Sequence, residues 1–415
     1  MNLVATRGSA LCGEANIPGD KSCSHRALIL GALAHGTTHI NGLLQSDDVL
    51  ATAQAVAAMG ATVERLGPGE CKVTGAKWTS PPAPIDCGNS GTSARLLLGA
   101  CAGVPGLSVT LTGDASLSNR PMRRVVTPLE RMGARFDGGD QLPITIHGQQ
   151  LGAIHHVNVP ASAQVKSALL LAGIASGVAV TVEEPVPSRD HTEIMLGQFG
   201  VPLIGCDIDI ASDPSSAAFA LVAAAIVSGS QVTVRRLLVN PLRTGLYEVL
   251  EEMGADISLA NERLQSGEII ADMSLRHAPL APCHVAPERI AAMIDEIPAL
   301  AVACAFADGE SVIEGLAELR VKESDRLGAM VAGLVACGVA AIADGDALRI
   351  FGRGRVRGGG KVVTHGDHRI AMAFLTLGLA SDQPVEVDQA EMIATSFPGF
   401  VGMMRGLGAN IGEAA

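Results

Sequence analysis

Basic residues stand at places in this sequence where strongly apolar helices are expected to begin. They are Lys21 and Arg26, Arg95, Lys166, Lys322 and Arg326, and Arg369. Because the free N–H groups of a helix N-terminus already carry positive charge, a cation there is unfavourable unless an anion binds beside it. Serines and threonines near these cations add hydroxyl donors for phosphate or carboxylate. The pattern therefore predicts a site for ligands with several negative charges.

Two carboxylates accompany these cations. Asp295 directly precedes an apolar helix, and Glu323 stands between two of the cations. A carboxylate before a helix is either an N-cap or an active-site base, and the sequence leaves both possibilities open for Asp295. The charged run 320–326 fits a solvated helix start as well as part of an anion site. The run 88–93, Gly-Asn-Ser-Gly-Thr-Ser, fits either a turn with an N-cap or an anion-binding loop, and it does not have the Gly-Lys-Ser/Thr ending of a P-loop.

The elements that must position these residues recur six times. One signature is a helical segment that ends in an apolar residue, a glycine and a small residue before a β-branched strand. Its glycines are Gly60, Gly133, Gly200, Gly254, Gly338 and Gly408. The second signature is a helix that is apolar almost all round and is followed by a strand. These helices cover residues 25–34, 93–102, 166–175, 217–227, 298–307 and 370–379.

Helices that are apolar on every side are buried. Six buried and six amphipathic helices, interleaved with strands, predict six similar α/β units, three in each of two domains. The alternative is one doubly wound sheet whose repeats arose by chance. We expect an N-terminal domain at residues 20–210 and a C-terminal domain formed by 1–19 and 211–415, joined by a hinge of two chain crossings.

Composition excludes several classes of function. The chain of 415 residues has a net charge of −12 and 2% aromatic residues, so it lacks the basic surface and the stacking platforms of nucleic-acid-binding proteins. No apolar run reaches the roughly 18 residues of a membrane-spanning helix. Nine scattered cysteines without a C-x-x-C pair fit free thiols in a reducing compartment. The histidine pairs His155-His156 and His365/His368 have no carboxylate or cysteine at metal-ligand spacing. We therefore expect a cytoplasmic protein without a metal that binds neither nucleic acid nor membranes.

Six motifs in the same order resemble the 5-enolpyruvylshikimate-3-phosphate synthase family over nearly the whole chain. They are Pro18-Gly19-Asp20-Lys21-Ser22, Gly88-Asn89 through Arg95, Asn119-Arg120-Pro121-Met122, Ser162-Ala163-Gln164, the run 320–327, and Asp367-His368-Arg369. The segments 188–192, 293–298 and 393–398 look like the class II branch, which includes glyphosate-tolerant bacterial enzymes. The resemblance implies a two-domain inside-out α/β barrel with three βαβαββ units in each domain.

The same resemblance implies an activity. It is the transfer of the enolpyruvyl group of phosphoenolpyruvate to the 5-hydroxyl of shikimate-3-phosphate, with release of phosphate, in chorismate and aromatic amino acid biosynthesis. It implies no cofactor and small-molecule partners alone, and we expect a monomer.

Carried over by position, the resemblance assigns residues to each substrate. For shikimate-3-phosphate it implies Ser22 and Arg26 at the carboxylate, Ser162, Gln164, Arg189 and Lys322 at the phosphate, and Asp295. For phosphoenolpyruvate it implies Lys21, Arg120, Gln164, Arg326 and Arg369, with backbone N–H groups at Gly91. Asp295 is the candidate to take the proton of the 5-hydroxyl, Glu323 to protonate the methylene carbon, and Lys21 to stabilise charge near both. The sequence does not decide which carboxylate performs which transfer.

The chain departs from many family members at two positions. Thr395 stands where many have a lysine, and Ala163 stands where many have a second serine. These differences remove a cation from the phosphoenolpyruvate site and a hydroxyl from the sugar-phosphate site, which Arg189 can cover. Tolerant class II relatives have alanine at the position of Gly91, and glycine leaves room for glyphosate. We therefore expect inhibition by glyphosate in competition with phosphoenolpyruvate.

Three other functions fit the residues less well. The enolpyruvyl transferase that acts on UDP-N-acetylglucosamine has Lys-Asn where this chain has Lys21-Ser22, and a reactive cysteine in the loop that covers residues 113–120 of this chain, where no cysteine occurs. A non-catalytic anion-binding protein has no use for Asp295 and Glu323, because each weakens anion binding. An RNA-end enzyme on a related fold is disfavoured by the negative charge and the few aromatic residues.

Overall fold

The computed structural model describes residues 1–414. They form two compact units. The N-terminal unit comprises Gly19–Ile210 and Leu264–Glu268, and the C-terminal unit comprises Met1–Pro18, Ala211–Arg263 and the residues from Ile269 on. None of the helices in residues 1–414 combines the length and the apolar character needed to cross a bilayer.

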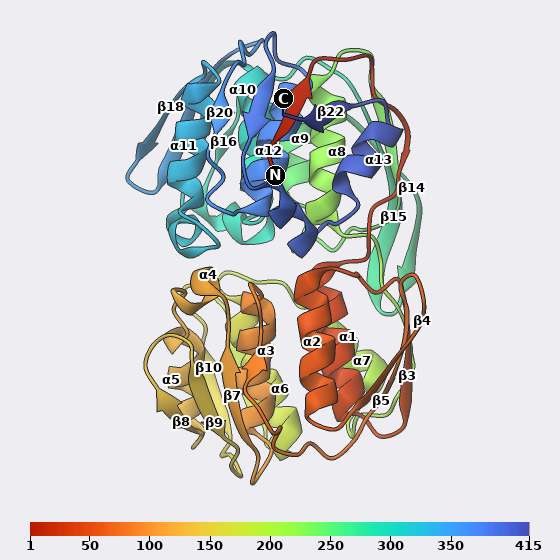
Figure 1. Cartoon of the computed structure of the whole chain (residues 1–415), viewed down its shortest axis with the longest axis vertical. Helices are drawn as coiled ribbons and strands as arrows, with labels where there is room; N and C mark the ends of the chain where they lie inside the picture. Colours follow the sequence, from red (N-terminus) through yellow and green to blue (C-terminus); the bar gives the residue numbers. More distant parts are fainter. Residues whose placement is uncertain (415) are drawn as a thin grey trace. The chain divides into compact units, whose positions relative to one another are not determined.

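Three sheets surround three buried helices in the N-terminal unit (Figure 1). The strand orders are β12 (Asp207–Asp209), β3 (Thr37–Asn41), β5 (Glu70–Thr74), β4 (Thr62–Gly67); β6 (Ile85–Asp86), β7 (Ser108–Thr112), β9 (Ile144–His147), β8 (Arg135–Gly138); and β10 (Ile154–Val157), β11 (Val180–Glu183). The buried helices are α1 (Lys21–Leu33), α3 (Gly91–Ala102) and α6 (Ala163–Ser176). The remaining helices are α2 (Asp47–Ala58), α4 (Ala115–Ser118), α5 (Arg123–Arg131) and α7 (His191–Phe199).

The C-terminal unit repeats this plan. Its strand orders are β14 (Asp256–Gln265), β15 (Glu268–Arg276), β13 (Gln231–Leu238), β2 (Cys12–Ala15); β16 (His284–Val285), β17 (Asp308–Ile313), β19 (Ala347–Arg353), β18 (Ala340–Asp344); and β20 (Lys361–Val362), β21 (Val385–Val387), β1 (Leu3–Thr6), β22 (Asn410–Glu413). The buried helices are α8 (Pro214–Ile226), α10 (Ile297–Phe306) and α12 (His368–Gly378). The other helices are α9 (Gly245–Glu252), α11 (Arg326–Ala336) and α13 (Phe400–Gly406), with 3₁₀ turns η1 (Pro287–Ala292), η2 (Ala317–Val321) and η3 (Ala390–Thr395).

A parallel strand pair in every sheet explains where the helices begin. The pairs are β12 with β3, β6 with β7, β10 with β11, β2 with β13, β16 with β17, and β20 with β21. Parallel strands need a crossover connection, and in four of these pairs a buried helix is that crossover. The helix therefore starts beyond the carboxyl end of the strand before it. Ligands of open α/β sheets bind at such ends.

The expected two-domain α/β fold is confirmed, with one difference from six equal units. Five sheets have four strands, but the third sheet of the N-terminal unit has two. After α7 the chain forms β12, and this strand pairs with β3 of the first sheet. The third repeat therefore completes the first sheet and does not extend its own.

A hairpin tip also departs from the sequence-based division. The tip of the β14–β15 hairpin, Leu264–Glu268, belongs to the N-terminal unit. The hydroxyl of Ser266 accepts a 2.8 Å hydrogen bond from the N–H of Asp209, and Glu268 Oε1 lies 2.6 Å from His191 Nδ1. These bonds fix the tip against β12 and the start of α7.

Close packing of α3 on α6 gives a test of this fold. A Cβ added to Gly99 would lie 2.0 Å from the carbonyl oxygen of Ala168, whereas a Cβ on Gly197 in α7 would meet nothing within 4 Å. Gly99→Ala should lower the free energy of unfolding by about 1–3 kcal/mol or more, because a backbone atom cannot move aside cheaply. Gly197→Ala should raise it by about 0.5–1 kcal/mol. Chemical denaturation measures both, and equal effects would contradict the helix contact.

Candidate active site

In the C-terminal unit, expected site residues form one connected cluster around Arg326. Its guanidinium contacts three carboxylates, those of Asp367 (2.8 Å), Glu323 (2.5 Å) and Asp295 (3.5 Å). Lys322 Nζ lies 3.5 Å from Asp295 Oδ1. Both proposed proton-transfer groups therefore contact the same arginine.

The position of Asp295 decides between a helix cap and a charged site. The N-cap residue of α10 is Glu296, and its side chain makes no capping hydrogen bond. Asp295 instead turns its carboxylate to Lys322 and Arg326. Its backbone carbonyl accepts a 2.9 Å hydrogen bond from Arg369. The N-cap interpretation is therefore wrong.

Two helix starts hold this cluster in place. Arg326 is the first residue of α11, which Asp325 caps by accepting a 3.0 Å hydrogen bond from the N–H of Gly328. Asp367 caps α12, and its Oδ1 accepts a 2.9 Å bond from the N–H of Arg369. Asp367 thus satisfies a helix end and pairs with Arg326 at the same time.

Arg326 is fully buried, with 0% exposure. Burial lowers its pKa, but the charges of Asp367, Glu323 and Asp295 raise it by more, so the pKa lies above the usual value. With the two other cations the cluster holds three positive groups and three carboxylates, and its charges balance. A ligand anion that binds Arg326 therefore competes with the charges of these carboxylates.

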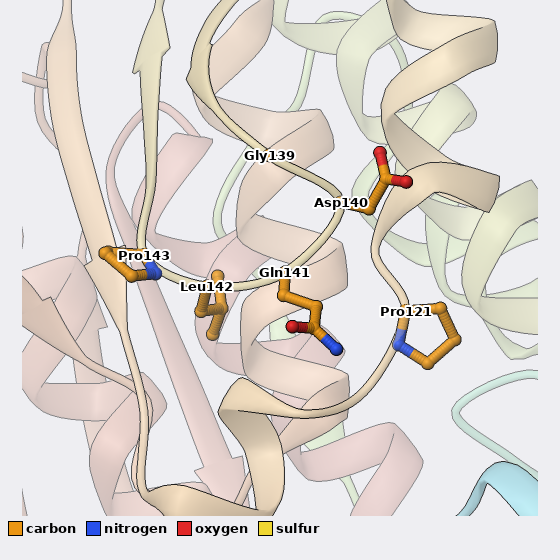
Figure 2. A pocket seen from close by; sticks show the side chains of 6 residues that line it. All are labelled: Pro121, Gly139, Asp140, Gln141, Leu142 and Pro143. Atoms are coloured by element: carbon orange, nitrogen blue, oxygen red, sulfur yellow. The ribbon is translucent and has the colours of Figure 1, made fainter.

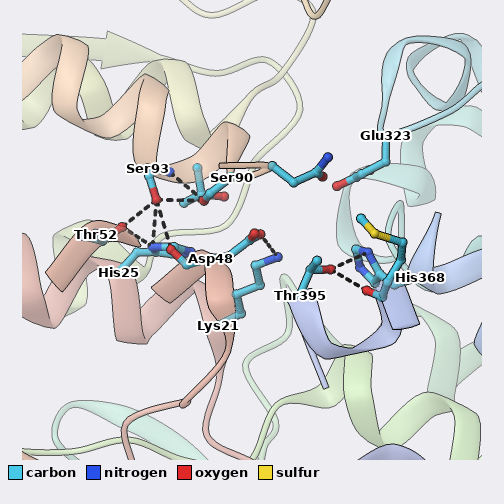
Figure 3. Close-up of polar contacts among 12 residues, drawn as sticks. Lys21, His25, Asp48, Thr52, Ser90, Ser93, Glu323, His368 and Thr395 are labelled. Carbon is cyan, nitrogen blue, oxygen red and sulfur yellow. Dashed lines mark hydrogen bonds and ion pairs between the residues drawn. The ribbon is translucent and has the colours of Figure 1, made fainter. Parts of the chain in front are cut away.

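In the N-terminal unit, Lys21 is the first residue of α1 and forms an ion pair with Asp48 (Figure 3). Asp20 caps this helix, accepting a 2.7 Å hydrogen bond from the N–H of Cys23. Asp48 lies in the first turn of α2, where a carboxylate is favoured by the helix dipole. The carboxylate compensates the cation at the neighbouring helix start.

Arg95 lies beside two of the expected anion contacts, Gln164 and Gly91. Its Nη1 donates a 2.8 Å hydrogen bond to Gln164 Oε1, and Gln164 Nε2 donates to Thr92 Oγ1 at 3.0 Å. A Cβ added to Gly91 would lie 2.9 Å from Arg95 Nη1 and 3.2 Å from Arg120 Nη1. Both guanidinium groups therefore lie against Gly91.

The turn before α3 engages the other donors of this region. The backbone N–H of Gly91 donates to the carbonyl of Asn89 at 3.1 Å. Arg120 Nη2 donates to Asn89 Oδ1 at 2.7 Å and to Ser116 Oγ at 3.2 Å. The N–H expected to bind phosphoenolpyruvate is thus used inside the turn, and a ligand gains it only if the turn changes.

Arg26 is 2% exposed, and its donors are engaged by neighbouring oxygens. Nε donates to Thr192 Oγ1 at 2.7 Å, Nη2 to Ser167 Oγ at 2.6 Å, and Nη1 to the carbonyl of Ser22 at 2.9 Å. Burial lowers the pKa of Arg26, and the charge of the half-buried Arg189 acts in the same direction. The structure thus places Ser22, Arg26 and Arg189 in one region.

The start of α6 combines capping with internal ion pairs. Ser162 is the N-cap residue, and its Oγ accepts a 3.5 Å bond from the N–H of Val165. Lys166 Nζ pairs with Glu184 at 2.7 Å and with Glu193 at 2.8 Å. Its charge is already compensated by these two carboxylates.

Thr395, which replaces the lysine of many relatives, is a buried residue of η3. Its hydroxyl donates a 2.7 Å hydrogen bond to the carbonyl of Met392 and lies 3.4 Å from His368 Nδ1. Figure 3 shows this contact between the end of η3 and the start of α12. The position carries a neutral group that is engaged within its own unit.

A surface hollow of about 760 Å³ lies next to Arg120 in the sequence, but its lining does not suit an anion (Figure 2). It is lined by Pro121, Gly139, Asp140, Gln141, Leu142 and Pro143. This lining contains a carboxylate and no cation. We therefore do not assign it to the site.

The structure also brings together three side chains of metal-ligating types. Ligand atoms of Asp20, Cys23 and His191 lie within 4.8 Å of one another. The sequence did not indicate this group, because His191 is far from the other two along the chain. Asp20 serves as the cap of α1, and His191 Nδ1 is bonded to Glu268. These bonds give the group a structural role at the start of α1.

Sequence reasoning missed several residues that hold the site together. They are Asp48, Thr192, Ser167 and Asp367, and Arg95 as the partner of Gln164. Asp48 and Asp367 had a usable signal, because each is an acidic residue at the start of an expected helix. Ser167 had none, and Thr192 stood only at the end of the motif 188–192, since the contacts of both with Arg26 appear only when helices distant in the sequence pack together.

Comparisons with known proteins agree on one family. The family model described as EPSP synthase (3-phosphoshikimate 1-carboxyvinyltransferase) matches residues 5–404. A protein of Phenylobacterium zucineum named 3-phosphoshikimate 1-carboxyvinyltransferase is 51% identical, over 99% of this chain and 96% of its own length. The structure of EPSP synthase from Acinetobacter baumannii is similar with a TM-score of 0.86 and 40% identity, covering 100% of both chains. The enolpyruvyl transferase NikO from Streptomyces tendae shares the fold, with a TM-score of 0.79, 18% identity and coverage of 100% and 98%.

The buried pair of Asp367 and Arg326 gives a stability prediction. Asp367→Asn keeps a capping side chain for α12 but leaves Arg326 without its closest buried charge, so the free energy of unfolding should fall by about 3–5 kcal/mol. Asp325→Asn is the matched control, because it also keeps a helix cap and loses an exposed ion pair with Arg320, which is worth at most about 1 kcal/mol. Denaturation curves that show equal losses would contradict the buried pair.

Proposed function

Since the chain belongs to the EPSP synthase (3-phosphoshikimate 1-carboxyvinyltransferase) family, we infer that it transfers the enolpyruvyl group of phosphoenolpyruvate to the 5-hydroxyl of shikimate-3-phosphate. Phosphate is the second product. The reaction serves aromatic amino acid biosynthesis through the shikimate pathway.

The observation that carries this inference is the cluster around Arg326. Three cations and three carboxylates meet where a 3₁₀ turn and two helix starts converge. Cations alone would suit an anion-binding protein. Carboxylates held beside them suit a reaction that moves protons on anionic substrates.

The chemistry needs two proton transfers to form the tetrahedral intermediate and a third to break it down. The oxygen of the 5-hydroxyl attacks C2 of phosphoenolpyruvate and loses its proton, while the methylene carbon gains a proton, giving a tetrahedral ketal phosphate. Loss of a proton from the methyl group and departure of phosphate then restore the enol ether. We assign Asp295 to the hydroxyl proton and Glu323 to the carbon proton, with Lys21 stabilising the developing charge. Their shared contact with Arg326 supports the pairing of the two carboxylates.

We propose that the remaining residues bind the two substrates as anions. Shikimate-3-phosphate would contact Ser22, Arg26, Ser162, Gln164, Arg189 and Lys322, and phosphoenolpyruvate would contact Lys21, Gly91, Arg120, Gln164, Arg326 and Arg369. Arginine suits both groups, because its planar fork binds carboxylate and phosphate through two hydrogen bonds. Since Arg26 and Arg326 are buried, binding has to rearrange their present contacts.

We further propose that the two units are the domains of the enzyme and that substrates bring them together. The residues assigned to the substrates are divided between the units. One reaction therefore needs residues of both units.

The nine free cysteines suit a reducing compartment, so we propose a cytoplasmic enzyme. Since every assigned residue comes from this chain, a monomer is sufficient.

Phosphate release tests the proposed activity. Phosphate should appear from phosphoenolpyruvate when shikimate-3-phosphate is present, because the phosphate leaves after the hydroxyl has attacked. Omitting shikimate-3-phosphate is the control. Release of phosphate without shikimate-3-phosphate, or no release with both substrates present, would contradict the proposal.

Replacing the two carboxylates tests the mechanism. Asp295→Asn and Glu323→Gln should each lower turnover by about 10²-fold or more, the usual size of acid–base catalysis. The double variant should lose less than the product of the two factors, because both groups act in one sequence of proton transfers. Asp344→Asn, an exposed carboxylate on β18, is the control. Near-normal turnover of Asp295→Asn would remove it from the mechanism.

Gly91 provides a prediction about glyphosate. We propose that the wild-type enzyme is inhibited in competition with phosphoenolpyruvate, although the neutral Thr395 acts against anion binding. A methyl group at Gly91 meets Arg95 and Arg120, so Gly91→Ala should weaken the inhibitor more than the substrate, by about 5- to 150-fold. Inhibition constants at several concentrations of phosphoenolpyruvate measure this. Wild-type activity that survives millimolar glyphosate at subsaturating phosphoenolpyruvate would contradict it.

A further inference from the structure

Helices α1 and α2 of the N-terminal unit are joined by two rungs of polar contacts. The first is the ion pair of Lys21 with Asp48, and the second is a 2.8 Å hydrogen bond between His25 Nδ1 and Thr52 Oγ1. Each rung lies four residues from the other on both helices, so the two rungs stack on the same faces. The second rung lies one helical turn behind Lys21.

The second rung continues to helix α3 (Figure 3). Thr52 Oγ1 lies 2.5 Å from Ser93 Oγ, and Ser93 Oγ lies 2.7 Å from Ser90 Oγ. Ser90 caps α3, accepting a 3.1 Å bond from the N–H of Ser93. Ser93 Oγ also donates to the backbone carbonyl of Asp48 at 3.3 Å. The chain of hydroxyls therefore ties together the first turns of α2 and α3.

The acceptors of Ser93 set the direction of the hydrogen bonds in this chain. The Ser93 hydroxyl donates to Ser90 Oγ at 2.7 Å and to the carbonyl of Asp48 at 3.3 Å, so its single proton points away from Thr52. Thr52 then donates to Ser93, and His25 Nδ1–H donates to Thr52. All three side chains are fully buried, as is His25 Nε2, which has no hydrogen-bond partner within residues 1–414.

The charge state of His25 agrees with this order. Burial lowers the pKa of His25 well below its usual value, and the charges of Lys21 and Arg26 act in the same direction against the opposing charge of Asp20. The ring is therefore neutral at pH 7. A neutral ring with its proton on Nδ1 completes the chain without placing a second cation behind Lys21.

We propose that Thr52, with His25 and Ser93, is a positioning residue that fixes Asp48 and thereby the ammonium group of Lys21. The proposal rests on the proposed function, because Lys21 is assigned there to phosphoenolpyruvate. Thr52 links the two neighbouring side chains, because its one hydroxyl accepts a hydrogen bond from His25 and donates one to Ser93. It touches no substrate and acts through Asp48.

A matched set of variants tests this role. Thr52→Val keeps the shape and removes both hydrogen bonds, and Thr52→Ser restores the hydroxyl. Thr38→Val is the control, because Thr38 on β3 of the same unit is 0% exposed and its buried hydroxyl has no hydrogen-bond partner within residues 1–414.

Thr52→Val should raise KM for phosphoenolpyruvate at least about fivefold, as expected when buried partners lose their hydrogen bonds. KM for shikimate-3-phosphate should change less than about twofold, and Thr52→Ser and Thr38→Val should resemble the wild type. Equal behaviour of Thr52→Val and Thr38→Val would overturn the proposal.

The wild-type protein offers a second test that needs no substrate. Nitrogen-15 NMR of the histidine rings, with His25 assigned by its loss in His25→Asn, should show a neutral ring protonated at Nδ1. Protonation at Nε2 would overturn the proposal, even if Thr52→Val does not fold. Wild-type protein that releases no phosphate from the two substrates would instead refute the proposed function, and the ring measurement would still decide the order of the hydrogen bonds.

Discussion

A cation at the positive end of a helix has to be balanced by negative charge, and this constraint shapes the candidate site residues of each unit. Lys21 begins α1 and is paired with Asp48, while Arg326 begins α11 and contacts three carboxylates. Each carboxylate holds a place that a substrate anion can compete for. The same groups that keep the cations in place without substrate therefore include those proposed to move protons.

The repeated fold supplies the helix ends that this arrangement needs. In four of the six sheets a short strand is followed by a buried helix, after β16 by way of the 3₁₀ turn η1, so the helix starts lie beyond the carboxyl ends of parallel strands. The helices tolerate this placement because they are built from Ala, Leu, Val and Ile and make their contacts inside the unit. In α8, for example, all residues from Pro214 to Ile226 are buried.

The sequence was sufficient to predict the repeated unit, the buried helices and the family, because these features depend on local spacing and on motifs. It also predicted catalytic roles for Asp295 and Glu323 and a binding role for Arg326, and in the structure Arg326 contacts both carboxylates. It did not indicate that Arg26 is held by Thr192 and Ser167, or that the tip of the β14–β15 hairpin belongs to the N-terminal unit. Such contacts join residues far apart in the chain, and no local pattern records them. The sequence also left open whether Asp295 is the N-cap of the helix that follows it. Only the position of Glu296 at the start of α10 excludes this interpretation.

The central proposal is that residues of both units act on one pair of anionic substrates. Small-angle X-ray scattering tests it most directly, with the protein alone, with shikimate-3-phosphate, and with shikimate-3-phosphate plus an unreactive analogue of phosphoenolpyruvate. The account predicts a smaller radius of gyration when both ligands are bound, because the assigned cations of both units then share the same anions. A radius that stays the same under saturating concentrations of both ligands would contradict it.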